Sequence, residues 1–256
     1  MNLDKKCKWL RHEILNILSK SKKGHVGGAL SCVEILVVLY YGGLLREQDK
    51  FILSKGHVSM ALYPILHDKG FISDEVYDKC YMNGNPLGGH PDTNTLGVVV
   101  DSGSLGHGLG IACGMALADR EKDIYVLMGD GECNEGSVWE SILFAAKHKL
   151  GNVILIIDKN NICATDFLKN ASPLQHLSGA LRQLEWAVTS IDGHDIDEML
   201  AYISKVRRIY PNQPCVVIAN TVKGKGVSYM EDSPKWHHGV PNEEQLAMAR
   251  REIDGS

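Results

Sequence analysis

An acidic residue and an amide follow two successive apolar segments of the chain. Asp130 stands between two glycines in GDGECNEGSVWE (129–140), and Asn160 stands thirty residues later in IIDKNN. Their side-chain oxygens, with the carbonyl of Ile162, are ligands that Mg²⁺ prefers when phosphate oxygens complete its shell. Gly131 lets the backbone approach a ligand closely, because it has no Cβ. The pattern indicates a site for a metal-bound diphosphate, although Asp-Gly alone is also a common turn.

Histidines form a second group of candidate residues. Most of them lie in glycine-rich stretches, away from the apolar stripes that pack helices together. A single histidine in such a place is as consistent with a structural role as with chemistry. Several neutral imidazoles that face one cleft, however, suit a reaction that moves protons between hydroxyl groups and carbon near neutral pH. The residues concerned are His25, His57, His90, His107 and His237, whereas His238 is expected to be only a neighbour in the loop.

The elements that must position these residues alternate along the chain from residue 98 onward. Nearly continuous apolar runs predict strands of a parallel sheet at residues 123–128, 152–157, 186–191 and 214–220. Segments with helical periodicity lie at residues 107–120, 136–149, 177–184 and 196–209. This alternation predicts an α/β fold with a doubly wound, mostly parallel sheet and helices on both faces. Ligands bind where the strands of such sheets end, and both GDG and DKNN fall there.

The remaining segments are predicted to be packing elements. They comprise helices at residues 3–20 and 57–70, a helix from an N-terminal cap at Ser31 to Gly42, a strand at 51–54, a short helix capped by Ser73, and a C-terminal amphipathic helix. No internal repeat or evident linker interrupts the 256 residues, a length that suits one large core. We therefore expect a single domain over residues 1–256.

Composition and charge exclude several classes of protein. The net charge is −4 and the basic clusters are short, which argues against a protein that binds nucleic acid or a membrane surface. The longest apolar run, residues 35–41, is too short to cross a bilayer, and the N-terminus lacks the apolar stretch of a secretory signal. Seven scattered cysteines without a C-x-x-C pair argue against disulfides and zinc. We expect a cytoplasmic protein.

Seven stretches resemble the transketolase family of thiamine diphosphate enzymes, in the family's order and over nearly the whole chain. Two of them are the GDG and DKNN stretches, which match the family's thiamine diphosphate binding motif. The others are GHVGGALS (24–31), ILSKGHVSMALYPIL (52–66), GGHPD (88–92), SGSLGHGLGIACGMA (102–116) and TVKGKGVSYME…KWHHG (221–239). The resemblance implies the thiamine diphosphate-binding fold, in the form of the domain that holds the diphosphate.

The resemblance also assigns roles to particular residues. The metal, Mg²⁺ with Ca²⁺ or Mn²⁺ as substitutes, is expected on Asp130, Asn160 and the Ile162 carbonyl. The diphosphate is expected beside Lys55, His57, Gly131, Lys223 and His237, and the cofactor's rings along Gly103, Ser104 and Leu105. The sugar channel is expected to be lined by His25, His57, His90 and His237, with His90 at the C1 hydroxyl of the two-carbon unit.

A few residues remain open to more than one interpretation. Glu135 is either an acid in the first turn of a helix or, by resemblance, an interface residue hydrogen-bonded to the acid that activates the cofactor. Cys133 and Cys163 lack a paired base, which favours packing over reactivity. His107 stands where the family commonly has glutamine, and Ala164 stands where many relatives carry a larger aliphatic residue.

The matched region lacks part of a transketolase active site. In the family, the glutamate that activates the cofactor comes from a pyrimidine-binding domain, which lies C-terminal to this region. The resemblance therefore implies the N-terminal subunit of a split transketolase, whose partner chain carries the pyrimidine-binding and C-terminal domains in an α2β2 assembly. The implied reaction moves a two-carbon ketol unit reversibly from a ketose phosphate to an aldose phosphate.

Three alternatives stay open at this point. One is related chemistry: a ketol transferase for an unusual sugar, or a subunit of a deoxyxylulose-phosphate-type synthase that uses pyruvate. A second is a non-catalytic subunit that binds the cofactor without turnover. A third, a nicotinamide dehydrogenase, is disfavoured because GSLGHGLG (103–110) is not followed by the acidic strand-end residue that reads ribose.

Overall fold

A five-stranded parallel sheet forms the centre of the protein. The structure, a computed structural model, describes residues 2–164, 166–172 and 176–255, and all five strands lie within them. The strands are β1 (Lys50–Leu53), β2 (Ile124–Gly129), β3 (Val153–Lys159), β4 (Ala187–Asp192) and β5 (Cys215–Asn220). Their order across the sheet is β1-β2-β3-β5-β4 and every pairing is parallel. Each predicted strand is present, with bounds shifted by one or two residues.

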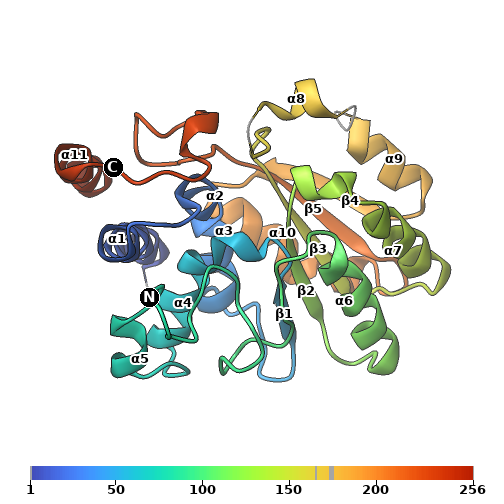
Figure 1. Cartoon of the computed structure of the whole chain (residues 1–256). Helices are drawn as coiled ribbons and strands as arrows, with labels where there is room; N and C mark the ends of the chain where they lie inside the picture. Colours follow the sequence, from blue (N-terminus) through green and yellow to red (C-terminus); the bar gives the residue numbers. More distant parts are fainter. Residues whose placement is uncertain (1, 165, 173–175, 256) are drawn as a thin grey trace.

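Helices cover both faces of this sheet, which confirms the predicted fold class (Figure 1). One face packs against α6 (His107–Ala118), α7 (Gly136–Lys147) and α9 (Leu177–Gln183). The other packs against α1 (Leu3–Ser21), α2 (Val26–Ser31), α3 (Val33–Tyr41), α4 (Ser59–Asp68) and α10 (Ile196–Ile209). Within the described residues, no helix is long and apolar enough to cross a membrane.

Alternate side chains of β2 show why the strands are apolar throughout. Val126 and Met128 are buried with α6, α7 and α9, whereas Tyr125 and Leu127 are buried with the helices of the opposite face. Successive side chains of a strand point to opposite faces, so a sheet covered on both sides needs an apolar residue at every position. The continuous apolar runs of the sequence are therefore a direct consequence of the layered architecture.

The predicted start of the helix expected to begin at a Ser31 cap is wrong. Two helices occupy this region, because α2 ends at Ser31 and α3 begins after Cys32. The Ser31 hydroxyl lies 2.6 Å from the carboxylate of Asp158, to which it donates, and 3.0 Å from the carbonyl of Gly28. The Ser31 hydroxyl, which local sequence assigned to a helix cap, thus donates to a buried carboxylate of β3 instead.

Short elements and the C-terminal helix complete the fold. The short elements are α5 (Asp74–Asp78), α8 (Leu168–Ala171) and 3₁₀ turns at Gly56–Val58, Gly131–Asn134 and Pro234–Trp236. Ser73 precedes α5 as expected, but its side chain makes no capping hydrogen bond. Helix α11 (Glu243–Gly255) packs beside α1, where Arg250 donates to Asn16 at 2.9 Å (Figure 1). The two ends of the described chain therefore lie on the same side of the molecule.

Ile156 tests how strongly the central strand supports the sheet. It is fully buried in β3, which lies between β2 and β5. Ile156→Ala should lower the free energy of unfolding by about 2–5 kcal/mol, because the cavity it leaves adds to the lost transfer free energy. Urea unfolding measures this change. Ile209→Ala, at a residue that is 53% exposed, is the control and should change stability by less than about 0.5 kcal/mol. Equal effects of the two substitutions would contradict the packing described.

Candidate active site

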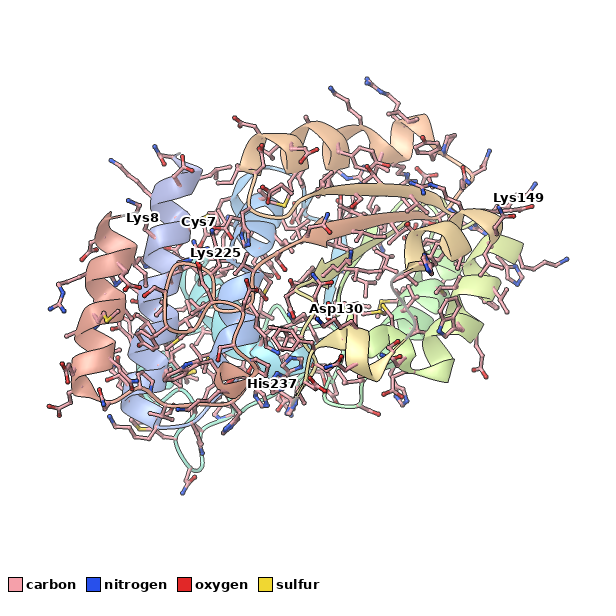
Figure 2. All side chains as sticks on the ribbon, turned by 90° about the horizontal axis from the view of Figure 1, so that it is seen from above. Cys7, Lys8, Asp130, Lys149, Lys225 and His237 are labelled. Atoms are coloured by element: carbon pink, nitrogen blue, oxygen red, sulfur yellow. The ribbon has the colours of Figure 1, made fainter. Side chains whose placement is uncertain are left out.

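A cavity of about 310 Å³ opens where the strands end. Twelve of the fourteen predicted site residues line it: His25, Lys55, His57, His90, Gly103, Leu105, Asp130, Gly131, Asn160, Ile162, Lys223 and His237. The other two, Ser104 and Glu135, are exposed and are not among the residues that line it. Figure 2 shows Asp130 near the centre of the molecule and His237 below it in this view, whereas Lys149 marks one outer end.

Asp130 is a buried carboxylate without an ion-pair partner among the described residues. It follows β2 directly, is 4% exposed, and accepts from the backbone N–H groups of Gly131 at 2.8 Å and Asn161 at 2.6 Å. Burial, with the nearby carboxylate of Asp158, raises the pKa of Asp130 to about 6. A buried carboxylate in this condition favours a bound cation, because an isolated charge is costly in the interior.

The turn after β3 brings further oxygen atoms to the same place. The Asn160 amide oxygen accepts from the backbone N–H of Ile162 at 3.2 Å, which folds the turn back on itself. Asn161 adopts a left-handed conformation with φ of 61°, which asparagine tolerates better than most residues. The side chain of Asn160 and the residue Ile162 therefore line the cavity beside Asp130. These oxygen donors have the chemistry that Mg²⁺ prefers.

Lys223 lies close to the expected metal ligands. Its ammonium donates to the carbonyls of Ile162 at 3.1 Å and Cys163 at 3.0 Å, and to Nδ1 of His237 at 2.8 Å. Burial, with the nearby Lys55 ammonium, lowers the pKa of Lys223 to about 8. The Ile162 carbonyl, expected to bind a metal, thus accepts from this lysine and keeps a second lone pair. Two ammonium groups and buried oxygens in one cavity suit a metal-bound diphosphate.

Asp158, which the motif analysis missed, connects the walls of the cavity. It lies within β3 and is fully buried. Its carboxylate accepts from the ammonium of Lys55, the hydroxyls of Ser31 and Thr221, and the amide of Asn160. Burial raises its pKa, but the Lys55 ammonium and these hydrogen bonds together hold the pKa of Asp158 below its usual value. An aspartate that interrupts an apolar strand was the signal available in the sequence.

Glu132 is a second residue that sequence reasoning missed. It is 2% exposed and lines the cavity. Its carboxylate accepts from Ser54 Oγ at 2.5 Å and from the backbone N–H groups of Gly106 at 2.9 Å and Gly129 at 3.3 Å. Gly106 has φ of 85°, and Gly103 in the same loop has φ of 147°, which glycine adopts without strain. Glu132 therefore fixes the loop expected to contact the cofactor's rings.

The histidines expected in a sugar channel are clustered around His25. Its ring centroid lies 5.1 Å from His57, 5.2 Å from His237, 4.8 Å from His238 and 6.5 Å from His90. Burial is the main cause of the lowered pKa of three of these rings, which falls to about 2 for His57, about 3 for His237 and about 4 for His25. These three side chains are therefore neutral near pH 7 and can both donate and accept hydrogen bonds.

The other residues left open by the sequence lie at different places. His107 is exposed at the first turn of α6 and is not among the residues that line the cavity. Cys133 is buried in the core on the α6 and α7 side, as packing predicts. Cys163 and Ala164 line the cavity. All seven cysteines are free thiols.

The His57 imidazole should make folding sensitive to acid. Its pKa is about 2 in the folded chain against 6.5 for the free side chain, so below pH 6.5 the unfolded chain binds a proton that the folded chain does not. Stability is then lost as pH falls. His57→Asn should reduce the loss between about pH 7 and pH 5 by up to about 2 kcal/mol.

Urea unfolding of wild type and variant at both pH values measures this effect. The control is His148→Asn, because His148 is exposed at the end of α7 and lies outside the cluster. Equal pH dependence in the wild type and in His57→Asn would show that His57 does not cause the acid sensitivity.

Comparisons with known proteins agree with this geometry. Residues 4–255 match the family described as transketolase, thiamine diphosphate binding domain. The chain is 38% identical to one of the subunits of apulose-4-phosphate transketolase from Phocaeicola vulgatus, over 95% of this chain and 90% of that protein. It is 34% identical to 6-deoxy-6-sulfo-D-fructose transketolase subunit SqwG of a Clostridium species, over 99% and 97%.

Solved structures and longer relatives extend the comparison. The crystal structure of transketolase from Campylobacter jejuni superposes with a TM-score of 0.89 at 31% identity, and it covers 99% of this chain but 43% of that one. Human transketolase is 32% identical over 93% of this chain and 40% of its own length. The chain thus spans less than half of these longer proteins. From the family match over nearly all its residues and the relatives above, we conclude that the chain belongs to the transketolase family and is its thiamine diphosphate binding domain.

Proposed function

We propose that the chain is the N-terminal, diphosphate-binding subunit of a two-subunit transketolase. With a partner chain it would move a two-carbon ketol unit reversibly between a ketose phosphate and an aldose phosphate. One observation carries the proposal: a single cavity joins the buried, uncompensated carboxylate of Asp130 to the amide of Asn160 and to two ammonium groups. This set of charges suits a divalent cation that is shared with a diphosphate.

Different residues would bind the metal, the diphosphate and the rings of the cofactor. Asp130, Asn160 and the Ile162 carbonyl would hold Mg²⁺, and Ca²⁺ or Mn²⁺ offer the same preference for oxygen ligands. The remaining contacts to the diphosphate would come from Lys55, His57, Gly131, Lys223 and His237, and contacts to the rings from Gly103, Ser104 and Leu105. When bound, thiamine diphosphate supplies an electron sink for the two-carbon unit.

Neutral histidines would act on the sugar. A sugar hydroxyl needs partners that donate as well as accept, and the lowered pKa values keep His25, His57 and His237 in the form that does both. His90 is exposed at the same cavity, where it would contact the C1 hydroxyl of the bound two-carbon unit. The N–H of each such ring can donate to one hydroxyl while its other nitrogen accepts from another.

A partner chain would complete the active site. The relatives that match over nearly their whole length are named as subunits, and the chain spans 40% of human transketolase. Glu135 is exposed at the start of α7, so its carboxylate is free to meet a partner. We expect two copies of each chain, because oligomers favour closed symmetry, and a cytoplasmic location, because all seven thiols are free.

An unusual sugar substrate is the second candidate. It is favoured by the names of two relatives, which specify apulose 4-phosphate and a sulfofructose. A synthase that uses pyruvate fits less well, because a cluster of neutral histidines matches a polyol better than a methyl ketone. Product analysis of the mixed subunits with xylulose 5-phosphate, with the two named sugars and with pyruvate separates these possibilities. Cofactor binding without turnover on any of them would favour a non-catalytic subunit.

Asp130→Ala should abolish the Mg²⁺ dependence of cofactor binding. The buried carboxylate would no longer hold the ion, so the affinity for thiamine diphosphate with Mg²⁺ should fall by more than about 100-fold. Isothermal titration with and without Mg²⁺ measures the loss. Asp197→Ala, at an exposed position of α10, is the matched control and should bind as the wild type does. Unchanged affinity in the Asp130 variant would remove it from the metal site.

His90→Ala should separate catalysis from cofactor binding. His90 lines the cavity but forms no described hydrogen bond with the expected metal ligands or with the two lysines. Cofactor affinity should therefore stay within about twofold of the wild-type value. Turnover by the mixed subunits should fall by about 100-fold, the usual scale for losing one group that handles protons. Wild-type turnover in this variant would exclude His90 from the reaction.

A further inference from the structure

Glu34 is a buried carboxylate that has no part in the cavity. It lies on α3, and only 9% of its side chain is exposed. One oxygen accepts from Nη2 of Arg11, on α1, at 2.6 Å. The other lies 2.9 Å from Nδ1 of His194, in the turn between β4 and α10. These three residues, called the clamp triad below, bring together elements that lie as far apart in the sequence as Arg11 and His194.

Geometry fixes the position of the proton on His194. The backbone N–H of Val222 points at Nε2 of this ring at 2.9 Å. A backbone amide only donates, so Nε2 must be the unprotonated, accepting nitrogen. The proton of the neutral ring is then on Nδ1, which donates it to Glu34. Glu34 therefore sets the tautomer that lets His194 hold the backbone of Val222.

The clamp triad reaches the same loop at a second point. Arg11, whose side chain is 8% exposed, donates from Nε to the carbonyl of Lys225 at 3.1 Å. Figure 2 shows Lys225 beside α1, near Cys7 and Lys8. The triad thus holds the loop at residues 222 and 225, on either side of Lys223. In the same loop, the Lys223 ammonium reaches into the cavity.

Stability alone does not explain such a group. A buried ion pair contributes little compared with apolar side chains of the same size, because both charges lose their hydration. Burial raises the pKa of Glu34, but the hydrogen bond from His194 and the charge of Arg11 hold it below its usual value. The carboxylate is therefore ionised, and its cost in desolvation is offset by hydrogen bonds that fix one geometry.

We propose that the clamp triad is a positioning device for the loop that carries Lys223. It would hold the backbone of residues 222–225 through contacts that lie outside the cavity lining, so that the lysine side chain starts from a fixed point. That the ligand of Lys223 is a diphosphate rests on the proposed function. The clamp itself rests on the contacts of the triad. None of its three members is among the residues that line the cavity, so each is a positioning residue.

Two substitutions of His194 separate its two hydrogen bonds. His194→Gln keeps an acceptor near the position of Nε2, and so it retains the bond from Val222. His194→Asn keeps a donor near the position of Nδ1, and so it retains the bond to Glu34 but leaves Val222 unpaired. By NMR hydrogen exchange, the Val222 amide should exchange roughly tenfold faster in His194→Asn than in the wild type, and at the wild-type rate in His194→Gln.

Glu34→Gln provides an independent test should His194→Asn fail to fold. Arg11 only donates, so the amide oxygen must face Arg11 and the NH₂ group must face Nδ1 of His194. Nδ1 then accepts, its proton moves to Nε2, and two N–H groups oppose each other at Val222. The Val222 amide should again exchange faster, and ¹⁵N spectra should show the ring in the other tautomer.

Cofactor titration of the same proteins links the clamp to the cavity. With Mg²⁺ and thiamine diphosphate, His194→Asn and Glu34→Gln should bind roughly tenfold more weakly, whereas His194→Gln should bind as the wild type does. The clamp would be refuted if the exchange rate of the Val222 amide and the cofactor affinity simply followed thermal stability in every variant. It would also be refuted if the Val222 amide of His194→Asn exchanged at the wild-type rate. A wild-type chain that binds no cofactor would refute the proposed function, and the exchange rates would still decide the clamp.

Discussion

The ion pair between Asp158 and Lys55 is the interaction on which the candidate site depends. It joins the end of β3 to the loop after β1, and the hydroxyls of Ser31 and Thr221 join the same carboxylate from α2 and from the loop after β5. Such a pair adds little net stability, but removal of one partner leaves an uncompensated buried charge. Because Lys55 is committed to Asp158, the neighbouring carboxylate of Asp130 pairs with no cation of the described chain and stays available for an ion.

The same arrangement of charge explains the state of the histidines. Burial removes water from His57 and His237, and the nearby ammonium groups of Lys55 and Lys223 further disfavour protonation of either ring. Neutral rings that both donate and accept are thereby kept in a cavity that also holds two cations. The proposed anchoring of a diphosphate and the proposed contacts to sugar hydroxyls would thus depend on the same distribution of charge, and neither requires a histidine to titrate near pH 7.

Local patterns predicted the strands and the polar residues that follow β2 and β3, because short stretches of sequence encode both. The resemblance to a family supplied most of the other residues that line the cavity. Apolar runs mark strands buried on two faces, and polar residues just after β2 and β3 mark the edge where ligands bind. Contacts that are distant in sequence were not accessible. Ser31 and Asp158 are 127 residues apart, so the hydroxyl was assigned to a cap. The insertion of β5 between β3 and β4 was equally invisible, because apolar runs carry no information about strand order.

The Lys223 ammonium, carried by a loop whose backbone is held at several points, is the remaining feature that links these elements. Lys223 donates to two backbone carbonyls and to His237, partners that an anionic ligand would replace without any movement of the main chain. This replacement of partners favours tight binding only if the loop is already ordered, because the entropy lost in ordering the loop on binding would reduce affinity. Thr221 fixes the loop to Asp158 at its start, and the clamp triad holds it at Val222 and Lys225. The preorganisation that such binding needs would therefore come from residues that do not line the cavity.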